Sequence, residues 1–160
     1  MQIDRAEISR YLGYGRRVPD PAVSRKIEEA VALLEQKAAP HALWAAYPVS
    51  IADATVKLGP LSVQSAALSR HLRGCVQACL FAATLGPAPD RLQQKAEVQN
   101  MALALTLQAA AAAMIEAYCD EEAERLAAHF APKKLYLRPR FSPGYGDFPL
   151  SFQPVLLRAH

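Results

Sequence analysis

Residues 90–130 read DRLQQKAEVQNMALALTLQAAAAAMIEAYCDEEAERLAAHF, with neither a glycine nor a proline among them. Alanine, leucine, glutamine and glutamate dominate the stretch, and these residues favour the α-helix. We therefore predict one very long helix, or two nearly collinear helices, ended by Pro132. The most apolar part, residues 101–115, is shorter than the roughly 18 consecutive apolar residues of a membrane span, so we expect a buried helix of a soluble protein.

Two shorter helices are predicted on the N-terminal side of this stretch. Asp4 is a typical N-cap residue and predicts a short helix over residues 5–12. Asp20 and Pro21 predict a second start, because aspartate caps and proline at the first helical position has no N–H to leave unbonded. Apolar residues then recur three or four positions apart as far as residue 38, which indicates an amphipathic helix.

The sheet is predicted mainly from two stretches. Residues 41–58 are rich in aromatic and β-branched residues without helical period, which indicates two strands or one bent strand. Residues 75–83 form a continuous apolar run, typical of a buried central strand. Residues 61–72 predict a short helix, residues 135–137 a short strand, and residues 150–160 the first turns of a helix.

Together these elements predict an α+β fold with a small, mostly antiparallel sheet, a long central helix and flanking helices. The chain has 160 residues, of which 52% are hydrophobic. That composition excludes intrinsic disorder and suffices for one full core. We therefore expect a single domain over residues 1–160.

Charge and cysteine content narrow the class of protein. The formal net charge is +3, and no basic run is longer than the pairs Arg16–Arg17 and Lys133–Lys134, which argues against a nucleic-acid partner. Three cysteines are too few for a disulfide framework and fit a reducing compartment. The N-terminus has no apolar signal segment, so we expect a cytoplasmic protein without a membrane partner.

The cysteines and histidines predict no metal site. Cys75 and Cys79 are four residues apart in the predicted strand, which separates them by about 13 Å, too far to share an ion. We interpret both, and Cys119, as small buried apolar residues. The four histidines form no i,i+4 pair with one another, so we predict neither a metal ligand nor a catalytic residue among them.

Glu116 follows the alanine-rich tract, which we expect to be mostly buried. A buried carboxylate must be paired with a cation or accept hydrogen bonds, since leaving it alone would cost several kcal/mol. Either a structural ion pair with an arginine or a functional role would explain a glutamate at this position.

The most unusual loop covers residues 138–149 and reads RPRFSPGYGDFP. Its prolines restrict the backbone, its two glycines allow a close approach, Tyr145 offers a ring and Arg140 a fixed cation. Such a loop can hold a zwitterionic ligand, with guanidinium bound to carboxylate and the aromatic face against a cationic or planar group. The alternative is a rigid connector whose Arg138 and Arg140 cap helix ends.

Residues 140–150, RFSPGYGDFPL, resemble the Arg-x-x-Pro-Gly-Tyr signature of the C-terminal reactivation domain of cobalamin-dependent methionine synthase. They resemble even more the small stand-alone relatives of that domain, in which Ser-Pro-Gly-Tyr-Gly-Asp is typical. Residues 10–14 (RYLGY), 83–86 (ATLG) and 115–117 (IEA) support the resemblance in order along the chain.

The resemblance implies a fold like the methionine synthase activation domain and a site that binds S-adenosylmethionine. In that family, oxidised cob(II)alamin is reduced by a flavodoxin-type donor and methylated from S-adenosylmethionine. The resemblance implies that Arg140 binds the methionyl carboxylate and that the backbone of Ser142, Gly144 and Tyr145 cradles the adenosine. Tyr145 would form one wall of the pocket, and Glu116 would face the ligand.

We therefore expect an accessory protein, not a complete enzyme, that acts in trans on the corrinoid-binding module of a methyltransferase such as methionine synthase. One alternative is an interaction protein that docks on a corrinoid protein without binding S-adenosylmethionine, and another is a generic anion-binding module. The family domain continues beyond the position where this chain ends. We expect a C-terminally shortened relative with one open pocket wall and an unpaired sheet edge, which favours a homo-oligomer.

Overall fold

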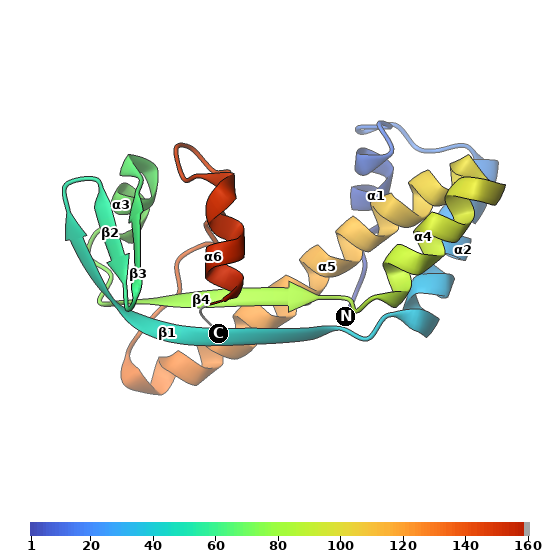
Figure 1. Cartoon of the computed structure of the whole chain (residues 1–160). Coiled ribbons are helices and arrows are strands. Elements are labelled where there is room, and N and C mark those ends of the chain that lie inside the picture. The colour runs from blue at the N-terminus through green and yellow to red at the C-terminus, as the bar shows by residue number, and fades with distance from the viewer. Residues whose placement is uncertain (159–160) are drawn as a thin grey trace. The chain divides into compact units, whose positions relative to one another are not determined.

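The computed structural model of the protein describes residues 1–158 and confirms the α+β class, with a long helix and a four-stranded antiparallel sheet (Figure 1). The chain forms two compact units. The helical unit comprises Met1–His41 and Ala83–Tyr136, and the sheet unit comprises Ala42–Ala82 and Leu137–His160. The single domain expected over residues 1–160 stays a prediction.

The helical unit consists of four helices and a short 3₁₀ turn: α1 (Arg5–Tyr11), α2 (Pro21–Lys37), α4 (Ala88–Gln99), α5 (Met101–Phe130) and η1 (Ala131–Lys133). The predicted starts of α1 and α2 are confirmed. The Asp4 carboxylate accepts a hydrogen bond from the Ala6 N–H, and the Asp20 carboxylate accepts two, from Ala22 and Val23.

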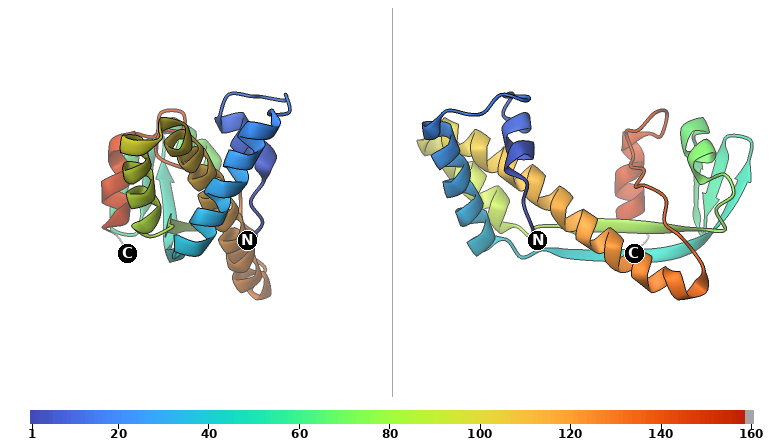
Figure 2. Two further views of the ribbon diagram at one scale, coloured as in Figure 1. Left: turned by 90° about the vertical axis from the view of Figure 1, so that its right-hand side faces the viewer. Right: turned by 180° about the vertical axis from the view of Figure 1, so that it is seen from behind.

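The core of the helical unit lies around the N-terminal half of α5, against which α1, α2 and α4 pack (Figure 2). Its most buried side chains include Ile8, Val31, Leu34, Leu107 and Met114. Residues 101–133 are long and apolar enough to cross a membrane by length and composition, a test that core helices of soluble proteins also pass. Within the most apolar 18-residue segment of this stretch, 39% is buried inside the protein.

The prediction of one helix or two collinear helices over residues 90–130 is wrong, because the chain turns at Asn100. There the backbone is extended, with φ −157° and ψ 90°, and α4 packs against α5. The Asn100 side chain accepts a hydrogen bond from the Leu103 N–H at 3.1 Å, while its own N–H donates to the Ala96 carbonyl at 2.7 Å. One asparagine therefore ends α4 and caps α5.

Replacing Asn100 by alanine is expected to lower the free energy of unfolding by about 1 kcal/mol, the usual cost of a lost N-cap. Urea unfolding followed by circular dichroism measures it. Gln99→Ala is the matched control, because Gln99 is an exposed neighbour and such surface changes stay within about 0.5 kcal/mol. Equal stability of the two variants would contradict the capping role of Asn100.

The sheet unit contains strands β2 (Thr55–Leu58) and β3 (Leu61–Gln64) and all but the terminal residues of β1 (His41–Ala52) and β4 (Gln77–Thr84). It also contains helix α3 (Ala66–Leu72), the 3₁₀ turn η2 (Leu150–Phe152) and helix α6 (Gln153–Leu157). The strand order is β3-β2-β1-β4. Tight turns join the first three strands, with Ala52 opposite Thr55 and Leu58 opposite Leu61. The predicted pair of strands over residues 41–58 is confirmed.

Three sequence-based predictions in this unit need correction. Residues 61–64 form β3, so the predicted helix begins only at Ala66, after its N-cap Ser65. β4 is an edge strand, not a central one, and most of its residues are half-buried. Residues 135–137 form no strand. The predicted helical turns are confirmed over residues 150–157, and residues 159–160 lie outside the described part.

The core of the sheet unit lies between the sheet, α3 and the C-terminal segment. Val56, Leu68, Leu80 and Phe148 are among its buried residues. Phe148 belongs to the loop of residues 138–149, so this loop, called the C-terminal loop below, contributes directly to the core.

Candidate functional site

The C-terminal loop is bound to the N-terminus of α3 through Asp147. The Asp147 carboxylate accepts hydrogen bonds from the Ser65 hydroxyl at 2.6 Å and from the Ala66 and Ala67 N–H groups at 2.8 and 2.9 Å. The Ser65 hydroxyl in turn accepts the Leu68 N–H at 3.0 Å. These bonds, that of Ser65 foremost, lower the pKa of Asp147 from 3.8 to about 2.

The opposite end of α3 is bound to the same loop through Arg138. Its Nη1 donates to the His71 carbonyl at 2.8 Å and its Nη2 to the Arg73 carbonyl at 3.0 Å. The His71 ring nitrogen Nε2 lies 3.0 Å from the Pro139 carbonyl, which can only accept, so this nitrogen is the donor. Arg138 therefore caps a helix end, as the connector interpretation predicted, and the loop holds α3 at both ends.

The loop folds back on itself between these two attachments. The Tyr145 N–H donates to the Ser142 carbonyl, the Phe148 N–H to the Tyr145 carbonyl, and the Gly144 N–H to the Phe148 carbonyl at 2.8 Å. Gly144 and Gly146 have φ of 98° and 56°, a region that favours glycine. A Cβ on Gly146 would lie 2.7 Å from the Ala67 Cβ, so glycine is also needed there for the close approach to α3.

Aromatic contacts fix the position of Tyr145. The Phe141 ring stacks on His71 with centroids 4.8 Å apart, and on the buried Phe148 with centroids 6.3 Å apart. Tyr145 contacts Phe141 edge-on, with centroids 5.6 Å apart. The Tyr145 side chain is still 55% exposed, so it offers ring surface to a ligand from a held position.

Four of the five predicted site residues lie together in this loop. Arg140, Ser142, Gly144 and Tyr145 are all exposed. The N–H groups of Gly144 and Tyr145 are engaged inside the loop, and Arg140, Ser142 and Tyr145 are exposed residues with polar side chains. Arg140 can bind a carboxylate and Tyr145 can face a planar or cationic group.

Glu116, the fifth predicted residue, lies on α5 in the helical unit, whereas the other four belong to the sheet unit. The expectation that it is a buried carboxylate is wrong, because Glu116 is exposed. The burial along α5 explains the difference: Ala113 and Met114 face the core of the helical unit, and Glu116 does not. The argument that a buried Glu116 carboxylate must have a partner therefore does not apply.

The cysteines are half-buried rather than fully buried. Cys75 precedes β4, Cys79 lies within it and Cys119 is on α5. Burial raises the pKa of the Cys79 thiol, which lowers its reactivity as a thiolate. Within residues 1–158, no three His, Cys, Asp or Glu side chains are grouped so that they could hold a metal ion.

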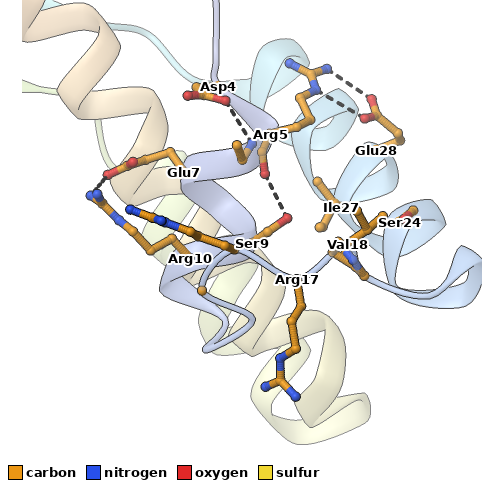
Figure 3. Close-up of a pocket in the computed structure, with 14 residues that line it drawn as sticks. Asp4, Arg5, Glu7, Ser9, Arg10, Arg17, Val18, Ser24, Ile27 and Glu28 are labelled. Carbon is orange, nitrogen blue, oxygen red and sulfur yellow. Dashed lines mark hydrogen bonds and ion pairs between the residues drawn. The ribbon is translucent and has the colours of Figure 1, made fainter.

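Sequence reasoning missed a hollow of about 660 Å³ in the helical unit, lined by α1, the loop that follows it and the start of α2 (Figure 3). Arg5 binds Glu28 there through two hydrogen bonds of 3.0 and 3.1 Å, and Arg10 pairs with Glu7. The side chain of Arg17 points away from these pairs (Figure 3). Arg5 and Arg10 therefore each have a carboxylate partner in this hollow.

The charge of Asp147 is expected to stabilise the attachment of the loop above about pH 4. Its folded-state pKa is lowered from 3.8 to about 2, so this contribution is present above the unfolded value and is lost as the pH falls from about 4 to about 2. Thermal unfolding of the protein and of Asp147→Asn at pH 6, 4 and 2 measures it. The variant should unfold at lower temperature at pH 6 and approach the unmodified protein at pH 2. A difference that does not depend on pH would contradict the role of the charge.

The chain matches no model of a known protein family, and no curated protein matches it.

Proposed function

We propose that the protein binds S-adenosylmethionine at the C-terminal loop and serves as an accessory domain for the reductive methylation of a corrinoid cofactor. The cofactor would be carried by a partner methyltransferase, methionine synthase being the one that the sequence resemblance suggests. A flavodoxin-type donor would supply the electron. Bound S-adenosylmethionine would supply the methyl group, while this chain would bind and orient it.

The observation that supports the proposal best is the fixed presentation of Arg140 and Tyr145. The segment that carries both residues is attached to α3 through Arg138 on one side and Asp147 on the other. A loop held in this way loses little conformational entropy on binding, which favours affinity. The methionyl part of the ligand carries a carboxylate for a guanidinium, and its sulfonium and adenine suit an aromatic face.

The second argument compares S-adenosylmethionine with a small anion as the ligand of the loop. The N–H groups of Gly144 and Tyr145 are engaged inside the loop, so these two amides do not bind an anion. A small anion such as phosphate would be held mainly by Arg140. A ligand with both a carboxylate and a ring system uses Arg140 and Tyr145 together, which favours S-adenosylmethionine over the generic anion.

A second candidate is an interaction protein that docks on a corrinoid protein without binding the small molecule. It is favoured by the structural use of the motif, because Asp147 caps α3 and Gly146 packs against Ala67. These residues would be required by the fold even if no ligand were bound.

Isothermal titration calorimetry of the full chain with S-adenosylmethionine separates the candidates. The proposal predicts a saturable binding isotherm, and S-adenosylhomocysteine, which keeps the carboxylate and adenosine, should compete. Inorganic phosphate should compete only weakly. No heat of binding at millimolar S-adenosylmethionine would contradict the proposal and leave the interaction protein as the better account.

A further inference from the structure

The hollow in the helical unit lies where three consecutive segments meet: α1, the loop of residues 12–20, called the α1–α2 loop below, and the start of α2 (Figure 3). Its volume of about 660 Å³ falls within the range of roughly 300–1,000 Å³ that is typical of small-molecule sites. The hollow therefore has room for a molecule larger than a simple ion.

Arginines outnumber carboxylates among the residues that line the hollow. The charged lining residues are Arg5, Arg10, Arg16 and Arg17 on one side of the balance and Asp4, Glu7 and Glu28 on the other. All three carboxylates are engaged within the protein, one as the N-cap of α1 and two in the pairs with Arg5 and Arg10. The surplus positive charge therefore belongs to the α1–α2 loop.

The two arginines of this loop have no carboxylate partner. None of the ion pairs within residues 1–158 includes Arg16 or Arg17, and both residues are exposed. The Arg17 Nε donates to the Tyr14 carbonyl at 3.5 Å, and its two Nη groups have no acceptor in the described part of the chain. The Arg17 side chain points away from the pairs formed by Arg5 and Arg10 (Figure 3). The loop thus offers two guanidinium groups to an anion.

The backbone of the α1–α2 loop offers further donors. The Arg17 N–H donates to the Tyr14 carbonyl at 3.0 Å, which closes a turn. The N–H groups of Gly15, Arg16 and Val18 form no hydrogen bond within residues 1–158. No atom lies within 4 Å of the position of a Cβ on Gly15, so a ligand can approach the backbone there. Unbonded N–H groups of a turn are known anion-binding groups.

The groups that the hollow leaves unused are donors and cations, so they select an anion rich in oxygen. A phosphate monoester has nearly two negative charges at neutral pH and three strong acceptor oxygens, which match two guanidinium groups and several N–H groups. A carboxylate has only one charge and two oxygens. We propose that the hollow binds a phosphate group, free or carried by a small molecule, at Arg16, Arg17 and the backbone of the α1–α2 loop.

This site is independent of the function proposed for the C-terminal loop. Its residues belong to the helical unit, whereas Arg140 and Tyr145 belong to the sheet unit. S-adenosylmethionine carries no phosphate. Phosphate bound in the hollow should therefore leave the affinity for S-adenosylmethionine unchanged, and failure of one site can be recognised separately from failure of the other.

Amide chemical shifts of the full chain, recorded during titration with inorganic phosphate and with glucose 6-phosphate, test the site. Both probes should give saturable shifts at Gly15, Arg16, Arg17 and Val18, whereas glucose and sodium chloride of matched ionic strength should not. Tighter binding of glucose 6-phosphate would indicate a phosphorylated small molecule as the ligand, and equal affinity would indicate the free ion. No saturable shift in the loop at millimolar phosphate, or the same shifts with sodium chloride, would overturn the proposal.

A double variant tests the two arginines. Arg16→Gln combined with Arg17→Gln should weaken phosphate binding by at least about tenfold, because hydrogen bonds between charged groups are lost. Arg70→Gln combined with Arg91→Gln is the matched control, since it removes the same charge at exposed positions on α3 and α4 outside the hollow. The control should keep full affinity. Equal losses in both double variants, or full affinity in a folded Arg16 and Arg17 variant, would overturn the proposal.

Discussion

Replacing Arg140 by glutamine is expected to weaken S-adenosylmethionine binding by at least about tenfold, which corresponds to about 1.4 kcal/mol. A hydrogen bond to a charged group contributes about 1.5–3 kcal/mol, and a guanidinium can form two with one carboxylate. Titration calorimetry of the variant and the unmodified protein measures the change in affinity. Arg70→Gln is the matched control, because Arg70 is an exposed cation on α3 outside the loop and should leave affinity unchanged.

The fold of the Arg140 variant can be verified independently. Arg138 and Asp147 form the hydrogen bonds that attach the loop to the two ends of α3, and thermal unfolding of the variant shows whether this attachment is kept. Full affinity in a folded Arg140→Gln variant would remove Arg140 from the site. Equal loss in Arg70→Gln would mean that net charge, and not a placed guanidinium, controls binding.

Replacing Gly146 by alanine is expected to lower the free energy of unfolding by about 2–4 kcal/mol. The new residue would have to adopt φ +56°, which costs about 1 kcal/mol or more, and its Cβ would meet the Ala67 Cβ at 2.7 Å, which adds about 1–3 kcal/mol. Chemical denaturation followed by circular dichroism measures the loss. It should be larger than the loss of about 1 kcal/mol expected for Asn100→Ala.

Two further variants separate backbone strain from the close contact. Gly15 has a similar φ of +60° but no atom within 4 Å of an added Cβ, so Gly15→Ala should cost only about 1 kcal/mol. Adding Ala67→Gly to Gly146→Ala removes the colliding atom and should recover part of the stability. If Gly146→Ala and Gly15→Ala cost the same, the packing of the loop on α3 is not as tight as described.

The features that the sequence predicted correctly are those set by neighbouring residues. Aspartate at positions 4 and 20 marks the two helix starts, because a cap acts on N–H groups two or three residues away. Asn100 carried the same kind of signal, since asparagine is a good N-cap residue, but the surrounding helix formers outweighed it. The position of β4 at the edge could not be predicted from its apolar run, because strand order depends on pairing between distant segments.

In the candidate site, too, local features could be predicted from the sequence, whereas contacts between distant segments could not. The glycines and prolines of residues 138–149 predicted a restricted loop, and Gly144 and Gly146 do have positive φ. The partner of Asp147 could not be predicted, because Ser65 is 82 residues away in the sequence. The same holds for Arg138, whose acceptors are carbonyl groups 67 and 65 residues away. Only the fold shows that the motif is used to hold α3.

Backbone amide chemical shifts of the full chain, recorded during titration with S-adenosylmethionine, test the central claim most directly. The proposal predicts saturable shifts at Arg140, Ser142, Gly144 and Tyr145, with the Arg140 side-chain Nε–H signal among the largest. Shifts confined to the hollow between α1 and α2, or no shift at millimolar ligand, would contradict the assignment of the C-terminal loop as the binding site.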